Sequence, residues 1–175
     1  MSTTLTLTPG IGPVVMSQID SPLGELILGV QNDRLIGIWF DGQKHFDGPQ
    51  EQWQQQPDHP VLLETQRQLQ DYFAGKLAEF DLPLAAAGTP FQQKVWQALL
   101  KIPFSETVTY GQVADWIGAT RGVRAVAAAI GRNPISVVIP CHRVIGANGK
   151  LTGYAGGLDR KRELLALEED QHALC

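Results

Sequence analysis

The sequence predicts an α/β protein of the α+β type, with a small antiparallel-sheet N-terminal domain over residues 1–87 and a mainly helical C-terminal domain with a helix-turn-helix over residues 88–175. Short β-rich runs fill the first forty positions, and two Thr-x-x-Gln capping boxes open helices in the second half. The chain has 175 residues, 43% of them hydrophobic. This is enough for a core in one ordinary domain or two small ones.

The composition excludes several classes of protein. No run of about 18 apolar residues offers a membrane span, and the N-terminus lacks the basic start and apolar run of a secretory signal. Cys141 and Cys175 are too few for a disulfide framework, and no CxxC motif or His-rich cluster supplies zinc ligands. We therefore expect a cytoplasmic protein with no metal, no cofactor and no membrane partner.

The first half contains three β-rich runs, at residues 14–20, 23–30 and 34–40, which are separated by turn-forming residues and predict an antiparallel meander. The Gln-rich segment 50–60 predicts an exposed loop. Apolar residues at helical spacing then predict a helix from Pro60 that stops at Gly75. Residues 82–88 predict a linker between the domains.

The second half opens with strong helix signals. Residues 89–92 combine a capping box with proline at the first helical position, and they predict a helix through about residue 100. Residues 109–112 repeat the capping box and predict a second, short helix that ends near Gly118. A three-residue connection, 118–120, leads to a third helix.

The third helix has two different faces. Its buried stripe is predicted from apolar residues at positions i, i+3, i+4 and i+7: Val123, Val126, Ala127 and Ile130. The opposite face carries arginines among small residues: Arg121, Arg124, Ala125 and Ala128. A helix-turn-helix fits this pattern, because alanines allow close approach to another backbone. An ordinary two-helix corner with solvated arginines fits it as well.

Charge is distributed unevenly along the chain. Residues 1–89 carry four basic and eleven acidic side chains, a net charge of −7, whereas residues 90–175 carry ten and seven, a net charge of +3. Residues 118–162 alone hold eight basic side chains and one acid, which gives +7. A binding site for a polyanion and a solvated surface are both compatible with this stretch.

Cys141 is the candidate nucleophile. Residues 135–139 are a β-branched run that predicts a strand ending at Pro140, and the basic side chains of His142 and Arg143 follow the cysteine and favour its thiolate. A small buried hydrophobic side chain is the alternative for a single cysteine. In an extended chain, His142 would reach the sulfur only through a turn or a bridging water.

A carboxylate in the last predicted helix, residues 159–170, completes the candidate site. Glu168 lies within the apolar stripe of this helix, four residues after Leu164. A carboxylate on a buried face needs a partner. That partner is either His142, which would make a Cys-His-Glu relay, or a basic side chain such as Arg143.

Five segments together resemble the O6-alkylguanine-DNA alkyltransferases, also called methylated-DNA–protein-cysteine methyltransferases: TYGQ at 109–112, NP at 133–134, IPCHRV at 139–144, GYAGG at 153–157 and LLALE at 164–168. The resemblance covers the whole second half. The first half fits the variable N-terminal domain of that family only in its length and β-rich start.

The resemblance implies stoichiometric DNA repair by a monomer acting on double-stranded DNA that contains alkylated bases. Members of the family bind the minor groove through a helix-turn-helix and rotate the damaged nucleotide into a pocket. The alkyl group then passes irreversibly from guanine O6 to the cysteine, and we expect O4-alkylthymine to be a second substrate. Each molecule acts once, because the thioether product has no low-energy exit.

Roles for individual residues follow from their positions in these motifs. Cys141 is implied as the alkyl acceptor, His142 as its base through a water, Glu168 as the group that orients His142, and Tyr110 as the donor to the departing guanine.

The resemblance also implies residues that bind DNA and the flipped base. Arg124 fills the space of the extruded base, and Arg121 and Ala125 share its exposed face. Asn133 braces the turn before the cysteine segment. The base pocket is lined by Tyr154 and by the backbone around Ala155.

The sequence departs from some relatives at the pocket, because Ala155 stands where they carry Ser or a larger polar residue. The preferred alkyl size is therefore left open. Two other functions fit part of the sequence. A non-enzymatic helix-turn-helix protein that binds DNA or senses damage would not need Cys141, and a thiol hydrolase would leave the basic helix without a role.

Overall fold

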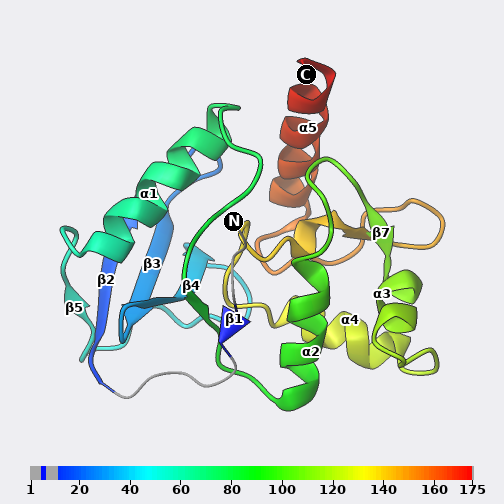
Figure 1. Cartoon of the computed structure of the whole chain (residues 1–175), viewed down its shortest axis with the longest axis horizontal. Helices are drawn as coiled ribbons and strands as arrows, with labels where there is room; N and C mark the ends of the chain where they lie inside the picture. Colours follow the sequence, from blue (N-terminus) through cyan, green and yellow to red (C-terminus); the bar gives the residue numbers. More distant parts are fainter. Residues whose placement is uncertain (1–4, 7–11, 175) are drawn as a thin grey trace. The chain divides into compact units, whose positions relative to one another are not determined.

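The computed structural model describes residues 5–6 and 12–174, and the chain forms two compact units (Figure 1). Unit 1 comprises residues 1–87 together with 134–136, and unit 2 comprises residues 88–133 and 137–175. Cys175, one of the two cysteines in the sequence, lies outside the described residues. None of the helices within the described ranges is long and apolar enough to cross a membrane.

The predicted antiparallel meander is confirmed in unit 1. Strands β2 (Val14–Ile19), β3 (Leu26–Gln31) and β4 (Arg34–Phe40) pair in sequence order. The turn between β3 and β4 consists of Asn32 and Asp33, both with positive φ (56° and 59°). Two residues with positive φ form the type of hairpin turn that matches the twist of the flanking strands.

Two segments that were predicted as irregular contribute to the same six-stranded sheet, whose order is β1-β6-β4-β3-β2-β5. The boundary between the two units falls within the linker predicted over residues 82–88, but this segment is not wholly irregular, because β6 (Leu84–Ala85) pairs in parallel with both β4 and β1 (Leu5–Thr6). Likewise, the predicted loop 50–60 contains β5 (Gln54–Gln55), which pairs in parallel with β2. Both strands have only two residues, too few to produce a recognisable alternation of apolar and polar side chains.

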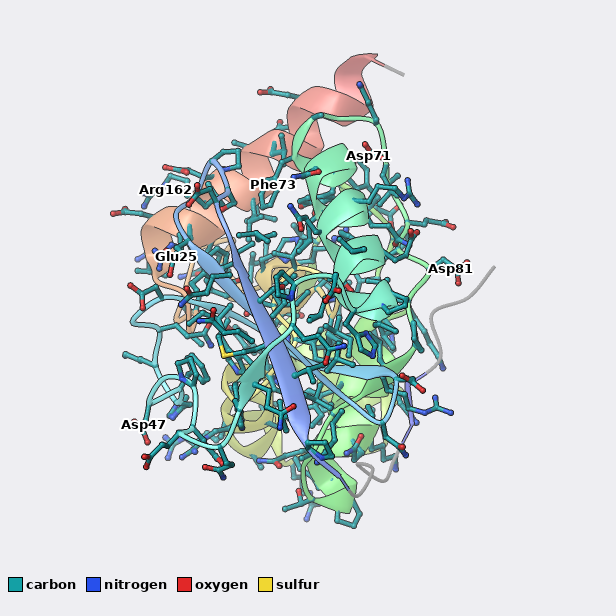
Figure 2. The ribbon with its side chains drawn as sticks, turned by 90° about the vertical axis from the view of Figure 1, so that its left-hand side faces the viewer. Glu25, Asp47, Asp71, Phe73, Asp81 and Arg162 are labelled. Carbon is teal, nitrogen blue, oxygen red and sulfur yellow. The ribbon has the colours of Figure 1, made fainter. Side chains whose placement is uncertain are left out.

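Helix α1 (Pro60–Phe73) lies across β2 and β3 (Figure 1) and buries Leu62, Leu69 and Tyr72. Asp71 and Phe73 mark its C-terminal end (Figure 2), and the helix stops before Gly75, whose φ is +77°. This stop was predicted from the sequence, because glycine adopts positive φ without steric penalty.

An aromatic cluster covers part of the same sheet. The ring of Trp39 stacks on Phe46, with 4.4 Å between ring centroids, and contacts Trp53 at 5.5 Å. Gly37 and Gly29 leave room for this ring, because a Cβ atom at Gly37 would overlap the indole. Trp53 belongs to the segment predicted as an exposed loop, and its packing explains why that segment is held against the sheet.

Unit 2 is mainly helical, as predicted, and contains α2 (Pro90–Leu99), α3 (Tyr110–Trp116), α4 (Val123–Gly131) and α5 (Leu158–Leu174). Both predicted capping boxes are present, with Thr89 capping α2 and Thr109 capping α3. Helices α2, α3 and α4 pack against one another (Figure 1).

The connection between α3 and α4 is longer than predicted. It spans residues 117–122 rather than 118–120 and includes Gly118, whose φ is +72°. The buried stripe of α4 is also shifted, because Val126, Ala129 and Ile130 are buried whereas Val123 is 38% exposed. Val123 is the first residue of the helix, and the buried positions begin at Val126, one turn further on; Ala127 is half-buried.

The strand predicted over residues 135–139 is not formed. Ile135 makes a single bridge to Ile38 within unit 1, and residues 136–138 form a turn in which Val137 adopts a φ of +71°. Positive φ is strained for a β-branched residue and persists only where the surroundings enforce it. A buried turn and a buried strand give the same apolar run, so the sequence could not separate them.

Candidate active site

The cysteine segment is a single turn of 3₁₀ helix, Cys141–Arg143, that follows Pro140. Cys141 is 5% exposed, His142 is fully buried and Arg143 is 6% exposed. A turn at this point is one of the two arrangements that the sequence left open for His142, the other being a bridging water. All three side chains can therefore be buried together, whereas successive residues of a strand point to opposite sides.

Asn133, which follows the C-terminal cap of α4, connects this helix with the cysteine segment. Its side-chain Nδ2 donates to the carbonyl oxygen of Ile139 at 2.9 Å and to Cys141 Sγ at 3.2 Å. The first bond fixes the loop, and the second offers a hydrogen bond to the sulfur. The predicted bracing position of Asn133 and the candidate nucleophile are thus in direct contact.

His142 and Glu168 form a buried pair, in which Nε2 of the imidazole lies 2.7 Å from Oε2 of the carboxylate. Because an ionised carboxylate only accepts hydrogen bonds, Nε2 carries the proton and Nδ1 keeps its lone pair when the ring is neutral. Within the described part of the chain, Nδ1 has no hydrogen-bond partner. This nitrogen is therefore able to act as a base.

The same carboxylate also binds Arg143 in a bidentate manner. Arg143 Nε donates to Oε1 at 2.8 Å and Nη2 to Oε2 at 3.0 Å, while the amide of Ser105 approaches Oε1 at 3.3 Å. Arg143 Nη1 donates to the carbonyl oxygen of Ile102 at 2.7 Å. The two partners considered for Glu168 are thus not exclusive, because one carboxylate serves both His142 and Arg143.

The buried groups have displaced pKa values. Burial raises the pKa of the Cys141 thiol, although the bond from Asn133 and the charge of Lys161 oppose the shift. Burial lowers the pKa of His142 against the opposing effect of Glu168. For Glu168, burial alone would raise the pKa, but the bonds and charges of His142 and Arg143 outweigh it and hold the pKa below its usual range. Both directions favour the uncharged forms of the thiol and the imidazole near neutral pH.

Lys161 is a site residue that was counted only as part of the basic stretch. It is fully buried in α5, and its Nζ donates to the carbonyl oxygens of Val144 at 2.6 Å and Thr152 at 2.8 Å. Desolvation lowers its pKa to about 8, while the charge of Cys141 acts in the opposite direction. The sequence did contain a signal, because Lys161 precedes Glu168 by seven residues and lies on the same face of the helix.

Tyr110 is brought to this cluster by a short parallel pairing. Strand β7 (Val108–Thr109) pairs with β8 (Val144–Ile145), so the start of α3 lies beside the residues that follow the cysteine turn. The Tyr110 hydroxyl lies 3.1 Å from Thr152 Oγ1, and Lys161 Nζ lies 5.9 Å from the centroid of the Tyr110 ring.

The remaining predicted residues lie on other parts of unit 2. Arg124 and Ala125 are exposed in the first turn of α4, and Arg121 is exposed in the connection before it; neither arginine side chain makes a hydrogen bond or ion pair within the described residues. Tyr154 is buried and Ala155 half-buried in the loop that leads to α5. The roles of these five residues toward DNA or a flipped base stay predictions.

The structure reduces the basic stretch that the sequence suggested. Of its eight basic side chains, Arg143 and Lys161 are buried, Arg162 pairs with Asp159, and Arg160 donates to Gly156. The other four of the eight are exposed, and their side chains make no ion pair or hydrogen bond with any described residue: Arg121, Arg124, Arg132 and Lys150. In residues 12–170, no three His, Cys, Asp or Glu side chains come close enough to hold a metal ion.

A thiol with a neighbouring base, in a unit that also presents arginines on an exposed helix, defines the class: a cysteine-dependent group-transfer protein with a helix-turn-helix. Two family models cover most of the chain. Residues 90–170 match the DNA binding domain of 6-O-methylguanine DNA methyltransferase, and residues 14–86 match its ribonuclease-like domain. The chain belongs to the 6-O-methylguanine DNA methyltransferase family.

Individual relatives agree with this assignment. The chain is 49% identical over 153 residues to a methylated-DNA–protein-cysteine methyltransferase of Mycobacterium bovis, covering 87% of this chain and 91% of the relative. It is 49% identical over 150 residues to the protein of that name from Methanosarcina acetivorans, covering 85% and 94%. A crystal structure of Mycobacterium tuberculosis OGT in complex with DNA matches with a TM-score of 0.84 and 47% identity, covering 90% of this chain and 94% of that one.

Proposed function

We propose that this chain repairs DNA by transferring the alkyl group of O6-alkylguanine in double-stranded DNA to its own Cys141. Methyl transfer from DNA to a protein cysteine is the activity of the family. The observation that supports Cys141 as the acceptor is its contact with Asn133, together with the state of the next residue: His142 is held through Nε2 by the buried carboxylate of Glu168 and keeps an unpaired Nδ1.

The proposed reaction moves one alkyl group and one proton. The thiol proton passes to His142 Nδ1 through a water, and the thiolate attacks the alkyl carbon. The new S–C bond forms as the C–O6 bond breaks, and the electron pair of the C–O6 bond goes to the guanine. The guanine finally takes up a proton, and the imidazolium gives up the one it received, so that the alkyl group is exchanged for a proton. Glu168 stabilises the imidazolium, and Tyr110 donates a hydrogen bond to the departing base.

Two further groups favour the thiolate in this scheme. Asn133 donates a hydrogen bond to the sulfur, and the positive charge of Lys161 opposes the rise in the thiol pKa that burial causes. Both act on a soft sulfur nucleophile, which suits displacement at a saturated carbon. The thioether product is stable, so each molecule acts once.

DNA binding is assigned to α4. A nearly buried thiol cannot reach a base that is stacked in a duplex, so the alkylated nucleotide has to leave the helix. We propose that α4 lies in the minor groove, where Ala125 and Ala128 allow close approach, Arg121 contacts the backbone and Arg124 fills the space of the extruded base. Tyr154 and the backbone at Ala155 would then line the base pocket, and O4-alkylthymine would be a second substrate.

The organisation of the chain supports an assignment of two domains. We assign residues 88–175 as the DNA-binding and alkyl-acceptor domain and residues 1–87 as a β-rich domain, in line with the two compact units and the two family models. We expect the protein to act as a monomer in the cytoplasm, where a reducing environment keeps a thiol such as Cys141 free.

The proposal is tested with duplex DNA carrying radiolabelled O6-methylguanine. We expect one methyl group per protein molecule, with none transferred to the Cys141→Ser variant. Label released to solvent or repeated turnover would indicate a thiol hydrolase, and DNA binding without transfer would indicate a damage sensor. Either result would refute the proposal.

A further inference from the structure

We propose that Thr152 is a positioning residue for Tyr110. Its hydroxyl donates a hydrogen bond to the phenol oxygen while the phenol donates a hydrogen bond to the departing base. The inference rests on the proposed function, in which Tyr110 makes that donation. The contact is direct, with 3.1 Å between Thr152 Oγ1 and the Tyr110 hydroxyl oxygen.

The hydrogen bond from Thr152 to the phenol oxygen should become stronger during the reaction. When the phenol donates to a base that is gaining negative charge, electron density moves onto the phenol oxygen, which becomes a better acceptor. The Thr152 hydroxyl can then donate to it, and the two hydrogen bonds strengthen each other. A bond that strengthens only as charge develops accelerates the chemical step rather than substrate binding.

Thr152 is held in place from the backbone. Lys161 Nζ donates to the Thr152 carbonyl oxygen at 2.8 Å and to that of Val144 at 2.6 Å. Val144 directly follows the cysteine turn, so one buried ammonium fixes both the segment that carries the nucleophile and the loop that carries Thr152. The same ammonium lies 5.9 Å from the centroid of the Tyr110 ring, where it attracts negative charge on the phenol.

The Thr152 side chain itself contributes little to packing. Thr152 is exposed, and a bond between two hydroxyl groups in water is nearly balanced by the bonds that each would make with water. The contact gains importance once DNA covers it and excludes water. Substitution of this side chain should therefore change the reaction without unfolding the protein.

The test compares isosteric and conservative variants of the full chain in single-turnover reactions with duplex O6-methylguanine DNA. We expect Thr152→Val to slow alkyl transfer about 5-fold, the range of one hydrogen bond, with the dissociation constant for DNA unchanged. Thr152→Ser should restore the rate to within about 2-fold, because it keeps the hydroxyl. Thr107 is exposed and makes no side-chain hydrogen bond within the described residues, so Thr107→Val is the matched control and should be neutral.

A double-mutant cycle assigns the effect to Tyr110. In the Tyr110→Phe background, Thr152→Val should cause no further loss. Equal losses in both backgrounds, a normal rate for Thr152→Val, or a change confined to DNA affinity would overturn the inference. Failure of the proposed function is a separate result, because then the unaltered protein transfers no methyl group or Tyr110→Phe reacts at the normal rate.

Discussion

Glu168 places a single negative charge between two buried groups that both depend on it. His142 needs the carboxylate to fix its tautomer, and Arg143 needs it to neutralise a guanidinium that is 6% exposed. Breaking a buried ion pair from one side leaves an uncompensated charge, which typically destabilises a protein by about 3–5 kcal/mol. Orientation of the base and stability of the turn are therefore linked at this one residue.

This linkage predicts the behaviour of Glu168→Gln, which keeps the shape of the side chain and removes its charge. We expect the free energy of unfolding to fall by about 3 kcal/mol and alkyl transfer to slow, because the imidazolium loses its counter-charge. Urea denaturation and single-turnover kinetics measure the two effects. The exposed neighbour Glu169→Gln is the control, and equal behaviour of the two variants would contradict the assignment.

The buried imidazole predicts how stability depends on pH. The pKa of His142 is lowered by burial, so below its ordinary value of 6.5 the unfolded chain takes up a proton that the folded protein does not. The free energy of unfolding should therefore decrease as the pH falls below 6.5. The depressed pKa of Glu168 adds a second loss below its ordinary value of 4.5. Denaturant titrations from pH 7 downward measure this, and stability that rises on acidification would be inconsistent with a buried neutral His142.

At the scale of elements, α4 has one face that packs against the rest of unit 2 and one face that we assign to DNA. Its buried face packs on α2, with Trp96 Nε1 donating to the Ala129 carbonyl oxygen at 2.9 Å, while its other face presents Arg124 and Ala125 to solvent. Asn133 then follows directly and contacts the nucleophile. The short chain between Arg124 and Cys141 thus links the helix assigned to DNA with the acceptor sulfur.

For α4 we predict that Arg124→Ala slows repair of duplex DNA by at least about 10-fold, because unstacking a base costs a few kcal/mol. The reaction with free O6-alkylguanine base should remain within about 2-fold of normal, since no base is extruded. Arg132→Ala removes the same charge at the other end of the helix and is the matched control for the loss of a cation: it should weaken DNA binding but leave the rate of transfer from saturating duplex DNA unchanged. Equal losses on both substrates would show that Arg124 acts on the chemistry instead.

Local signals explain which elements the sequence could predict. The capping boxes at Thr89 and Thr109 are complete within four residues, and the meander strands are joined by short turns, so both were found. The two-residue strand β6 and the turn at Val137 depend on partners far along the chain, and a short apolar run does not reveal them. The contacts of Glu168 with both His142 and Arg143 likewise needed the fold, whereas Lys161 was overlooked although it shares the helical face of Glu168.

At the scale of the whole molecule, the acidic net charge of −4 conceals a net charge of +3 in residues 90–175. The sequence suggested eight cations in residues 118–162, but two are buried and two are engaged by neighbouring groups. Only a part of that charge is therefore available to bind phosphate.

The available charge predicts the salt dependence of DNA binding. Arg124 is assigned to the space of the extruded base, so three free cations of this stretch remain for phosphate contacts: Arg121, Arg132 and Lys150. If these three contact phosphates, the logarithm of the association constant should fall with the logarithm of salt concentration with a slope of about −3. Fluorescence anisotropy at several salt concentrations measures this slope. A slope of about −7 would require all eight cations of residues 118–162, and a slope near zero would rule out phosphate contacts from this stretch.

The central claim is that Cys141 receives the alkyl group and keeps it. Mass spectrometry of the protein after reaction with unlabelled O6-methylguanine duplex tests it directly. The account predicts one added methyl group on every reacted molecule, located by peptide mapping on Cys141 and stable on prolonged incubation, with unmodified guanine left in the DNA. A methyl group found on any other residue, or lost from Cys141 with time, would contradict it.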